Sequence, residues 1–288
     1  MTTAPAFLAS ELPPTSPEDA RLHVLPAPYE ATVSYGGGTA AGPEAILRAS
    51  QQLEVFDGYS QPADLGIYTH PAVDCAGDAE TVLGRIEAAV SSILDLSGVP
   101  ALLGGEHTVT LGALRALKAR FGTFGVIQFD AHADLRDTYS DTPYSHACVM
   151  RRACELGLPL FQIGVRAISP EELAFRAATP SIAHLDATRL WEQGVPSPLL
   201  PPDFPSNIYV TFDVDGLDSA LMPATGTPEP GGLTWREAIR AIHLATAGRR
   251  VLGLDVVELA PEPGLRHAEY TAARLTYMLM GAAQRSTK

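Results

Sequence analysis

Four apolar segments of this chain each run directly into a short stretch of acidic and imidazole side chains. Residues 102–103 are followed by Gly-Gly-Glu-His-Thr, and residues 126–129 by Asp-Ala-His-Ala-Asp. Residues 209–212 are followed by Asp-Val-Asp-Gly-Leu-Asp, and residues 252–255 by Val-Val-Glu. Ligands of open α/β sheets bind just outside the carboxyl ends of the strands, so we expect the four stretches to converge on one crevice.

The spacing within these stretches places their side chains on common sides of the chain. Residues two apart in an extended chain point the same way. Bare carboxylates held close together would repel and raise one another's pKa, a conflict that divalent cations remove. The pattern therefore predicts a metal site. Its candidate ligands are His107, Asp130, His132, Asp134, Asp213 and Asp215.

The number and type of these ligands indicate which metal they would hold. Six ligands, with carboxylates that can bridge, are too many for one tetrahedral zinc ion and suit two ions about 3.5 Å apart. Oxygen ligands with a minority of imidazole favour Mn²⁺ over thiolate-seeking metals. A lone Asp-x-Asp is usually a solvated loop or a helix cap. The joint occurrence of two acid clusters and a histidine, each ending an apolar strand, favours two Mn²⁺ per chain.

The remaining chain alternates between short apolar runs and longer helical patterns. Near-continuous apolar strands separated by helices predict a mainly parallel eight-stranded sheet in a single-domain, three-layer α/β/α fold. Strands are expected at residues 22–26, 64–67, 100–103, 125–129, 160–163, 182–185, 208–212 and 251–256. Helices are expected at residues 42–52, 78–96, 108–120, 146–156, 170–177, 186–192, 234–247 and 267–283. Asp78 and Ser169 are the predicted caps of two of these helices.

No shift in composition and no long polar linker divides the chain. Residues 1–20 contain several prolines and are expected to form a partly ordered N-terminal arm, with residues 21–288 as one catalytic domain. The proline-rich stretch 194–206 is expected to be a surface connection.

The composition of the 288 residues excludes several classes of protein. With 20 basic and 33 acidic residues the formal charge is −13, which argues against nucleic acid and anionic membrane surfaces as partners. A cationic small substrate is compatible with this charge. Three scattered cysteines, an N-terminus without a basic head and the absence of a long apolar run predict a soluble cytoplasmic protein without disulfides.

Several segments resemble the motifs of the ureohydrolase family, which includes arginase and agmatinase, and agmatinases most of all. The likeness extends from about residue 26 to residue 281. Glu106 stands where aspartate is frequent, Ser219 replaces a usual proline, alanine or glutamine, and Ala40 and Ala41 occupy a position where relatives often carry arginine. The matching segments are LGGEHTVT (103–110), IQFDAHAD (127–134), TFDVDGLD (211–218), PATGTP (223–228), YEATVSYG (29–36), GPEAI (42–46) and YSHACVMRR (144–152).

The resemblance implies an arginase-like fold and assigns roles to individual residues. One Mn²⁺ would be held by His107, Asp130, Asp134 and Asp213, and the other by Asp130, His132, Asp213 and Asp215, so that Asp130 and Asp213 bridge. A hydroxide between the ions would attack the guanidinium carbon, with Asp134 steadying the tetrahedral intermediate. His146 would carry a proton to the leaving amine, and Glu258 would bind the substrate guanidinium.

The expected substrate is agmatine, which would give putrescine and urea. In arginases, hydroxyls and amides before the shuttle histidine grip the α-carboxylate of arginine. Here Asp141 lies in that stretch, where it would disfavour a carboxylate and tolerate a terminal amine. The resemblance also implies a homo-oligomer, a trimer or a hexamer.

Alternatives to this function remain open. Within the family they are arginase, guanidinobutyrase and formiminoglutamase. A single-zinc deacetylase of similar sheet architecture is more distant, because both acid clusters and His107 are intact. A non-catalytic scaffold subunit of the same fold is also possible, although such proteins usually lose metal ligands.

Overall fold

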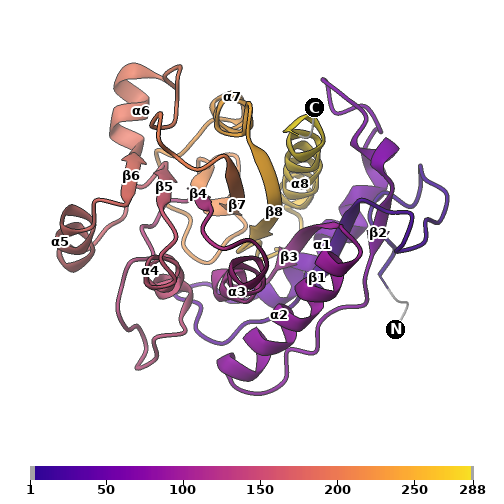
Figure 1. Cartoon of the computed structure of the whole chain (residues 1–288), viewed down its shortest axis with the longest axis horizontal. Coiled ribbons are helices and arrows are strands. Elements are labelled where there is room, and N and C mark those ends of the chain that lie inside the picture. Colours follow the sequence, from indigo (N-terminus) through magenta and orange to yellow (C-terminus); the bar gives the residue numbers. More distant parts are fainter. Residues whose placement is uncertain (1–3, 287–288) are drawn as a thin grey trace.

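A single parallel sheet organises the chain, which the computed structural model describes from residue 4 to residue 286. The eight strands lie in the order β2-β1-β3-β8-β7-β4-β5-β6 (Figure 1). Every pairing between neighbouring strands is parallel, as predicted. The strands are β1 (Leu22–Ala27), β2 (Ile67–Thr69), β3 (Val99–Gly104), β4 (Gly125–Phe129), β5 (Leu160–Ile163), β6 (Ile182–Leu185), β7 (Asn207–Asp213) and β8 (Arg250–Val257).

The helices begin close to the residues that the sequence predicts. Asp78 precedes α2 and accepts the Thr81 N–H at 2.8 Å. Ser169 precedes α5 and forms a reciprocal capping box with Glu172, so both predicted caps are confirmed. The α-helices are α1 (Gly42–Ala49), α2 (Ala79–Asp95), α3 (Thr110–Phe121), α4 (Val149–Glu155), α5 (Pro170–Ala178), α6 (Ala187–Gln193), α7 (Trp235–Thr246) and α8 (Arg266–Ser286).

Helices cover both faces of the sheet, which confirms the three-layer prediction. Side chains alternate along each strand, so Ala101 and Leu103 of β3 join one apolar core and Leu102 joins the other. The first core is closed by α1, α6, α7 and α8, and the second by α2, α3 and α4. Figure 1 shows α7 and α8 on one side of the sheet and α2, α3 and α4 on the other.

One predicted strand is wrong in its position. Residues 64–67 were expected to be extended, but Pro62–Leu65 form a 3-10 turn and β2 begins only at Ile67. Proline at the start of the turn fixes a helical φ, and Gly66 at its end adopts a φ of +71°. The chain becomes extended only where it pairs with Leu22–Val24 of β1.

The segment before β1 contacts the body of the protein. Phe7 and Leu8 are buried, and their N–H groups donate to Thr69 Oγ1 and Ser50 Oγ, each at 2.9 Å. The division into an arm of residues 1–20 and a catalytic domain of residues 21–288 stays a prediction. Within residues 4–286, no helix combines the length and apolar character needed to cross a bilayer.

The order of the strands places the polar stretches together. The strands β3, β8, β7 and β4 are consecutive neighbours in the middle of the sheet. Because all are parallel, their carboxyl ends share one edge, and each of the four polar stretches follows one of these strands. The topology thus gathers segments that are up to about 150 residues apart in sequence, as for His107 and Glu258.

Candidate metal centre

A pair of stacked rings sets two of the acid clusters side by side. Phe129 of β4 and Phe212 of β7 are partners in the sheet, and their rings stack with centroids 4.7 Å apart. Asp130 and Asp213 are the next residues along the two strands. The packing of these two phenylalanines in the core therefore fixes the distance between the two clusters. From the sequence alone, the closeness of the two clusters could only be assumed.

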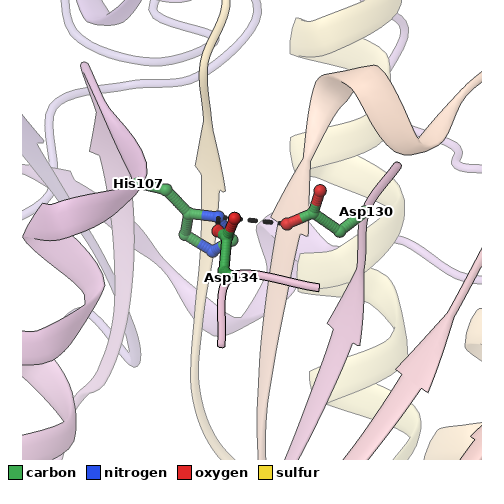
Figure 2. A group of neighbouring side chains, drawn as sticks. All are labelled: His107, Asp130 and Asp134. Atoms are coloured by element: carbon green, nitrogen blue, oxygen red, sulfur yellow. Dashed lines mark ion pairs between the residues drawn. The ribbon is translucent and has the colours of Figure 1, made fainter. Parts of the chain in front are cut away.

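The first group of side chains surrounds His107, which begins a 3-10 turn after β3. Its Nδ1 lies 3.0 Å from Asp134 Oδ2, 3.2 Å from Asp130 Oδ2 and 3.5 Å from Asp213 Oδ2. Figure 2 shows His107, from the turn after β3, pointing toward Asp130 and Asp134, which belong to the stretch after β4. These four side chains are the set that the family resemblance assigns to one ion.

The second group surrounds His132. Its Nδ1 lies 3.0 Å from Asp215 Oδ2 and 3.6 Å from Asp130 Oδ1. Asp130 therefore presents one oxygen to His107 and the other to His132, as a bridging carboxylate would. For Asp213 the measured contacts are the one to His107 and a 2.9 Å hydrogen bond that its Oδ1 accepts from the Asp215 N–H.

The electrostatics of the cluster show a conflict between burial and charge. Burial, followed by the charges of Asp215 and Asp130, raises the pKa of Asp213 well above its usual range. Burial and Asp130 also raise the pKa of Asp134 to about 7. Burial opposes charge on His132 as well, but Asp130 and Asp215 raise its pKa to about 12. The buried carboxylates thus lack enough compensating positive charge, which divalent cations would supply.

A buried hydrogen-bond chain fixes the orientation of the His107 ring. Thr211 Oγ1 donates to Asp255 Oδ1 at 2.6 Å, so it accepts from His107 Nε2 at 2.8 Å. Asp255 also accepts the hydroxyls of Tyr209 and Thr110. With the ring proton held on Nε2, Nδ1 faces the carboxylates and needs positive charge beside it, either a second proton or a metal ion. This donor set fits a metal ion.

Two glycines allow close backbone approaches around the site, and two of its acids adopt strained backbone conformations. A Cβ on Gly216 would come 2.8 Å from the Asp130 backbone N, and one on Gly105 only 2.1 Å from the Tyr29 carbonyl oxygen. Asp134 and Glu258 adopt left-handed φ values of +54° and +65°. Such strain in non-glycine residues concentrates at functional sites.

Glu258 is buried beside the first group. Its Oε1 accepts the His107 N–H at 2.7 Å. Burial is the main cause that raises its pKa well above the usual range, with Glu106 and Asp215 adding to the effect. A carboxylate so poorly compensated would bind a guanidinium readily.

A cavity of about 350 Å³ reaches one side chain of each group, Asp134 of the first and His132 of the second. His146, in a 3-10 turn before α4, also lines this cavity. Burial, and then the charges of His107 and His132, lower the pKa of His146 to about 4. The other lining residues include Ser34, Arg136, Tyr139, Ser169, Glu172 and Thr227.

The structure does not place Asp141 in this cavity. Asp141 is exposed at the tip of a turn, with a φ of +62°, and Tyr139 and Thr142 close the turn by two backbone hydrogen bonds. The side chain of Tyr139 lines the cavity instead. Asp141 is thus not among the residues that line the cavity, and its role in selecting the substrate stays a prediction.

Several residues around the site escaped prediction. Thr32 and Ser34 come from a loop after β1, and their hydroxyls lie 3.1 Å from His146 Nδ1 and 3.4 Å from His146 Nε2. Asp255 carried a usable signal, because an acid inside an apolar strand needs hydrogen-bond partners. Arg136 carried none, since arginine is common in any polar loop.

Comparisons with known proteins extend over almost the whole chain. The arginase family profile matches residues 20–281. The N(1)-aminopropylagmatine ureohydrolase of Synechocystis sp. is 39% identical over 296 residues, which cover 96% of this chain and 92% of that protein. The agmatinase of Pyrococcus horikoshii is 34% identical over 283 residues, covering 96% of each. The agmatine ureohydrolase structure from Thermoplasma volcanium has a TM-score of 0.87 at 28% identity, covering 99% of this chain and 96% of that chain.

Proposed function

The chain belongs to the arginase family of ureohydrolases, and from that premise we propose that it is a binuclear manganese enzyme that releases urea from agmatine or from N(1)-aminopropylagmatine. With agmatine the products would be putrescine and urea. The two substrates share a guanidinium at one end and a cationic amine chain at the other. Curated relatives named for each substrate are similarly close to this chain, at 39% and 34% identity.

The observation that carries the proposal is the position of Asp130. Its two oxygens face two different imidazole nitrogens, and each nitrogen is also beside a second carboxylate, Asp134 or Asp215. A single ion would not require the two oxygens of one carboxylate to face separate imidazoles. Two adjacent ions bridged by that carboxylate would require this arrangement.

The ligand chemistry supports manganese as the metal. Four of the six proposed ligands are carboxylates and two are imidazoles, a set that suits Mn²⁺ better than softer metals. When bound, a pair of such dications lowers the pKa of a coordinated water so that a nucleophile is available near neutral pH.

The surrounding side chains supply binding and proton transfer. Glu258 would hold the guanidinium, since its Oε2 is free of the His107 N–H and a carboxylate oxygen can accept two hydrogen bonds. Asp134 would orient the attacking water by accepting a hydrogen bond. His146 would accept a proton at Nε2, the nitrogen on the side of Ser34, and pass it to the leaving amine.

One feature of the cavity favours a second candidate substrate. Arg136 lines the cavity, where its guanidinium lies over the Tyr139 ring and 4.0 Å from Glu172 Oε2. If Arg136 left Glu172, it could bind a substrate carboxylate, as in guanidinobutyrate. While it stays paired with Glu172 and stacked on Tyr139, it is less available, and a cationic tail can extend over the hydroxyls of Ser34 and Thr227.

A side-by-side assay tests the proposal. Urea release would be measured from agmatine, N(1)-aminopropylagmatine, guanidinobutyrate and arginine, after Mn²⁺ loading and after chelation. We expect manganese-dependent release from one or both cationic substrates, with kcat/KM at least about 100-fold above that for the two carboxylate substrates. This ratio corresponds to about 2.7 kcal/mol of discrimination.

Each other outcome points elsewhere. Preference for guanidinobutyrate that is lost in Arg136→Gln would establish the second candidate. No urea from any guanidino compound would favour a non-catalytic scaffold, and full activity with one zinc per chain would contradict the binuclear proposal. The homo-oligomer, a trimer or a hexamer, remains a proposal that light scattering can test.

A further inference from the structure

The loop after β1 and the turn that carries His146 meet at one hydroxyl group. Thr32 Oγ1 lies 3.1 Å from His146 Nδ1 and accepts the backbone N–H of His146 at 3.2 Å. The two residues are 114 positions apart in sequence. The Thr32 hydroxyl therefore contacts both the backbone and the ring of His146. Whether this hydroxyl donates or accepts determines which nitrogen of the ring carries the proton.

Glu106 determines where the Thr32 hydroxyl donates its hydrogen. Glu106 is fully buried, and its Oε2 accepts the N–H groups of Ala31 and Thr32 at 2.5 and 2.7 Å. Its Oε1 accepts the hydroxyls of Thr32 and Thr108 at 2.9 and 2.6 Å. All four partners donate, which is the pattern of a carboxylate that acts only as an acceptor.

A count of hydrogens then decides the tautomer of the ring. The Thr32 hydroxyl has one hydrogen, and it is donated to Glu106. Thr32 Oγ1 can therefore only accept from the imidazole, so the neutral His146 ring must carry its proton on Nδ1. Nε2 is left with its lone pair, on the side of Ser34, which lines the cavity. The Ser34 hydroxyl donates to the Tyr139 hydroxyl at 3.1 Å and lies 3.4 Å from Nε2, too far for a strong hydrogen bond, so the Nε2 lone pair stays open to the cavity.

A second hydroxyl competes for the same nitrogen. Ser145 Oγ lies 3.3 Å from His146 Nδ1, accepts the Ala147 N–H and keeps its own hydrogen free to donate. If Ser145 donated to Nδ1, the lone pairs of Nδ1 and Thr32 Oγ1 would face each other at 3.1 Å. With the proton on Nδ1, both hydroxyl oxygens can accept it. The tautomer set by Glu106 is therefore the one without this repulsion.

We propose that Glu106, acting through Thr32, is a positioning residue that holds the proton of neutral His146 on Nδ1 and keeps Nε2 open toward the cavity. The inference rests on the proposed role of His146 in proton transfer, which needs one free nitrogen on the cavity side. Glu106 touches neither substrate nor metal in this assignment. Its effect passes through one hydroxyl.

Substitution of Glu106 by glutamine should reverse the tautomer. The amide oxygen of Gln would take the place that accepts the two N–H groups, and its NH₂ would then face the Thr32 and Thr108 hydroxyls. Thr32 would receive a hydrogen bond there and would be free to donate to His146 Nδ1. The ring proton would then move to Nε2, the nitrogen that must accept a proton.

Long-range ¹H–¹⁵N NMR of the full chain reads the tautomer directly. Spectra would be recorded above pH 7, metal-free and with diamagnetic Mg²⁺, and His146 would be assigned by the signal lost in His146→Gln. We expect the Nδ1–H form in the wild type, the Nε2–H form in Glu106→Gln and a mixture in Thr32→Val. Thr32→Ser, which keeps the hydroxyl, should restore the wild-type form.

Two matched controls separate this effect from loss of packing. Ser145→Ala removes the competing hydroxyl, and Thr108→Val removes a hydrogen bond to Glu106 that has no path to His146. Both should keep the Nδ1–H form. An Nε2–H form in the wild type, or a tautomer that changes in Ser145→Ala and not in Thr32→Val, would overturn the proposal.

Kinetics provide the second readout. Glu106→Gln and Thr32→Val should lower kcat roughly 10- to 100-fold with less than about a threefold change in KM, and Thr32→Ser should recover most of kcat. If the tautomer changes while kcat does not, His146 is not the proton carrier and the proposed mechanism fails. If kcat falls while the tautomer is unchanged, the positioning role fails. The two failures are therefore distinguishable.

Discussion

The carboxylate of Asp255 and the imidazole of His107 are joined through a single hydroxyl group. Thr211 donates to Asp255 at 2.6 Å and accepts from His107 Nε2 at 2.8 Å. Glu106 and His146 are joined through Thr32 in the same way. In each of these two hydrogen-bond series, a buried acid accepts the hydroxyl hydrogen of the threonine. The threonine oxygen can therefore only accept a hydrogen bond from the ring. In our proposals, the first acid points a ligand nitrogen of His107 at the metal site, and the second keeps Nε2 of His146 open to the cavity.

Asp255→Asn should weaken metal binding without removing a ligand. The amide would donate to Thr211, which would disturb the ring orientation of His107, and loss of such a partner typically costs about 10- to 100-fold in metal affinity. Titration of the metal-free protein with Mn²⁺, followed by electron paramagnetic resonance, measures this loss. Tyr209→Phe is the control, since it removes one hydrogen bond to Asp255 and leaves Thr211 in place. Equal affinities in Asp255→Asn and wild type would contradict the orienting role.

Metal content should respond differently to the shared and unshared ligands. His132→Ala removes a side chain that contacts Asp130 and Asp215, and it should leave about one Mn²⁺ per chain, held near His107. Asp130→Asn weakens both positions and should leave less than one. Metal analysis after dialysis against low micromolar Mn²⁺ gives both numbers. Retention of two ions in Asp130→Asn would show that this carboxylate does not bridge.

Two glycine-to-alanine substitutions should change stability in opposite directions. A Cβ on Gly105 would meet the Tyr29 carbonyl oxygen at 2.1 Å, so Gly105→Ala should cost ~3 kcal/mol and displace Glu258, whose N–H donates to the Gly105 carbonyl. Gly84 lies inside α2, where an added Cβ would meet no atom within 4 Å. Gly84→Ala should therefore stabilise the protein by about 0.5–1 kcal/mol. Urea denaturation measures both, and a neutral Gly105→Ala would rule out the close approach.

Acid should destabilise the protein partly through Asp57. Burial opposes its charge, but Arg285 and the N–H groups of Ser60 and Tyr59 lower its pKa below the ordinary value. The unfolded chain therefore takes up this proton first, so the stabilisation is present above about pH 4 and is lost as the pH falls through the lowered pKa.

Asp57→Asn should thus lower the free energy of unfolding by ~3 kcal/mol at pH 7 and flatten its decline below about pH 4. Denaturant titrations from pH 3 to pH 7 give the profile. Glu44→Gln breaks an exposed ion pair with Arg48 and should change stability by less than about 0.5 kcal/mol. An unchanged acid limb in Asp57→Asn would assign the acid sensitivity to other carboxylates.

Local patterns were sufficient for most of the fold. Apolar runs of β-prone residues predicted seven strands within a few residues of their observed bounds, because a strand buried on both faces needs an unbroken apolar run. The exception was β2, a three-residue edge strand beside Pro62 and Gly66, where backbone preference outweighed a weak apolar signal. Cap residues such as Ser169 were predicted correctly because a capping box is itself a local interaction.

The candidate ligands could be named from the sequence because each directly follows an apolar strand, and alternation along an extended chain groups them. The position of Asp141 outside the cavity lining and the absence of Thr32 and Asp255 from the predicted site share one cause. Asp141 depends on the path of an irregular turn, and the other two act across more than 40 positions of sequence.

By itself, the sequence determined which residue types stand at the end of each strand, since hydrophobic periodicity and spacing are properties of neighbouring residues. Which strands are neighbours, and therefore that Asp130 faces both His107 and His132, follows from the folded arrangement of the sheet. The same holds for the hydroxyl groups of Thr32 and Thr211, which donate to Glu106 and Asp255. Hydrogen bonds depend on contacts within about 3 Å between segments that the sequence leaves far apart.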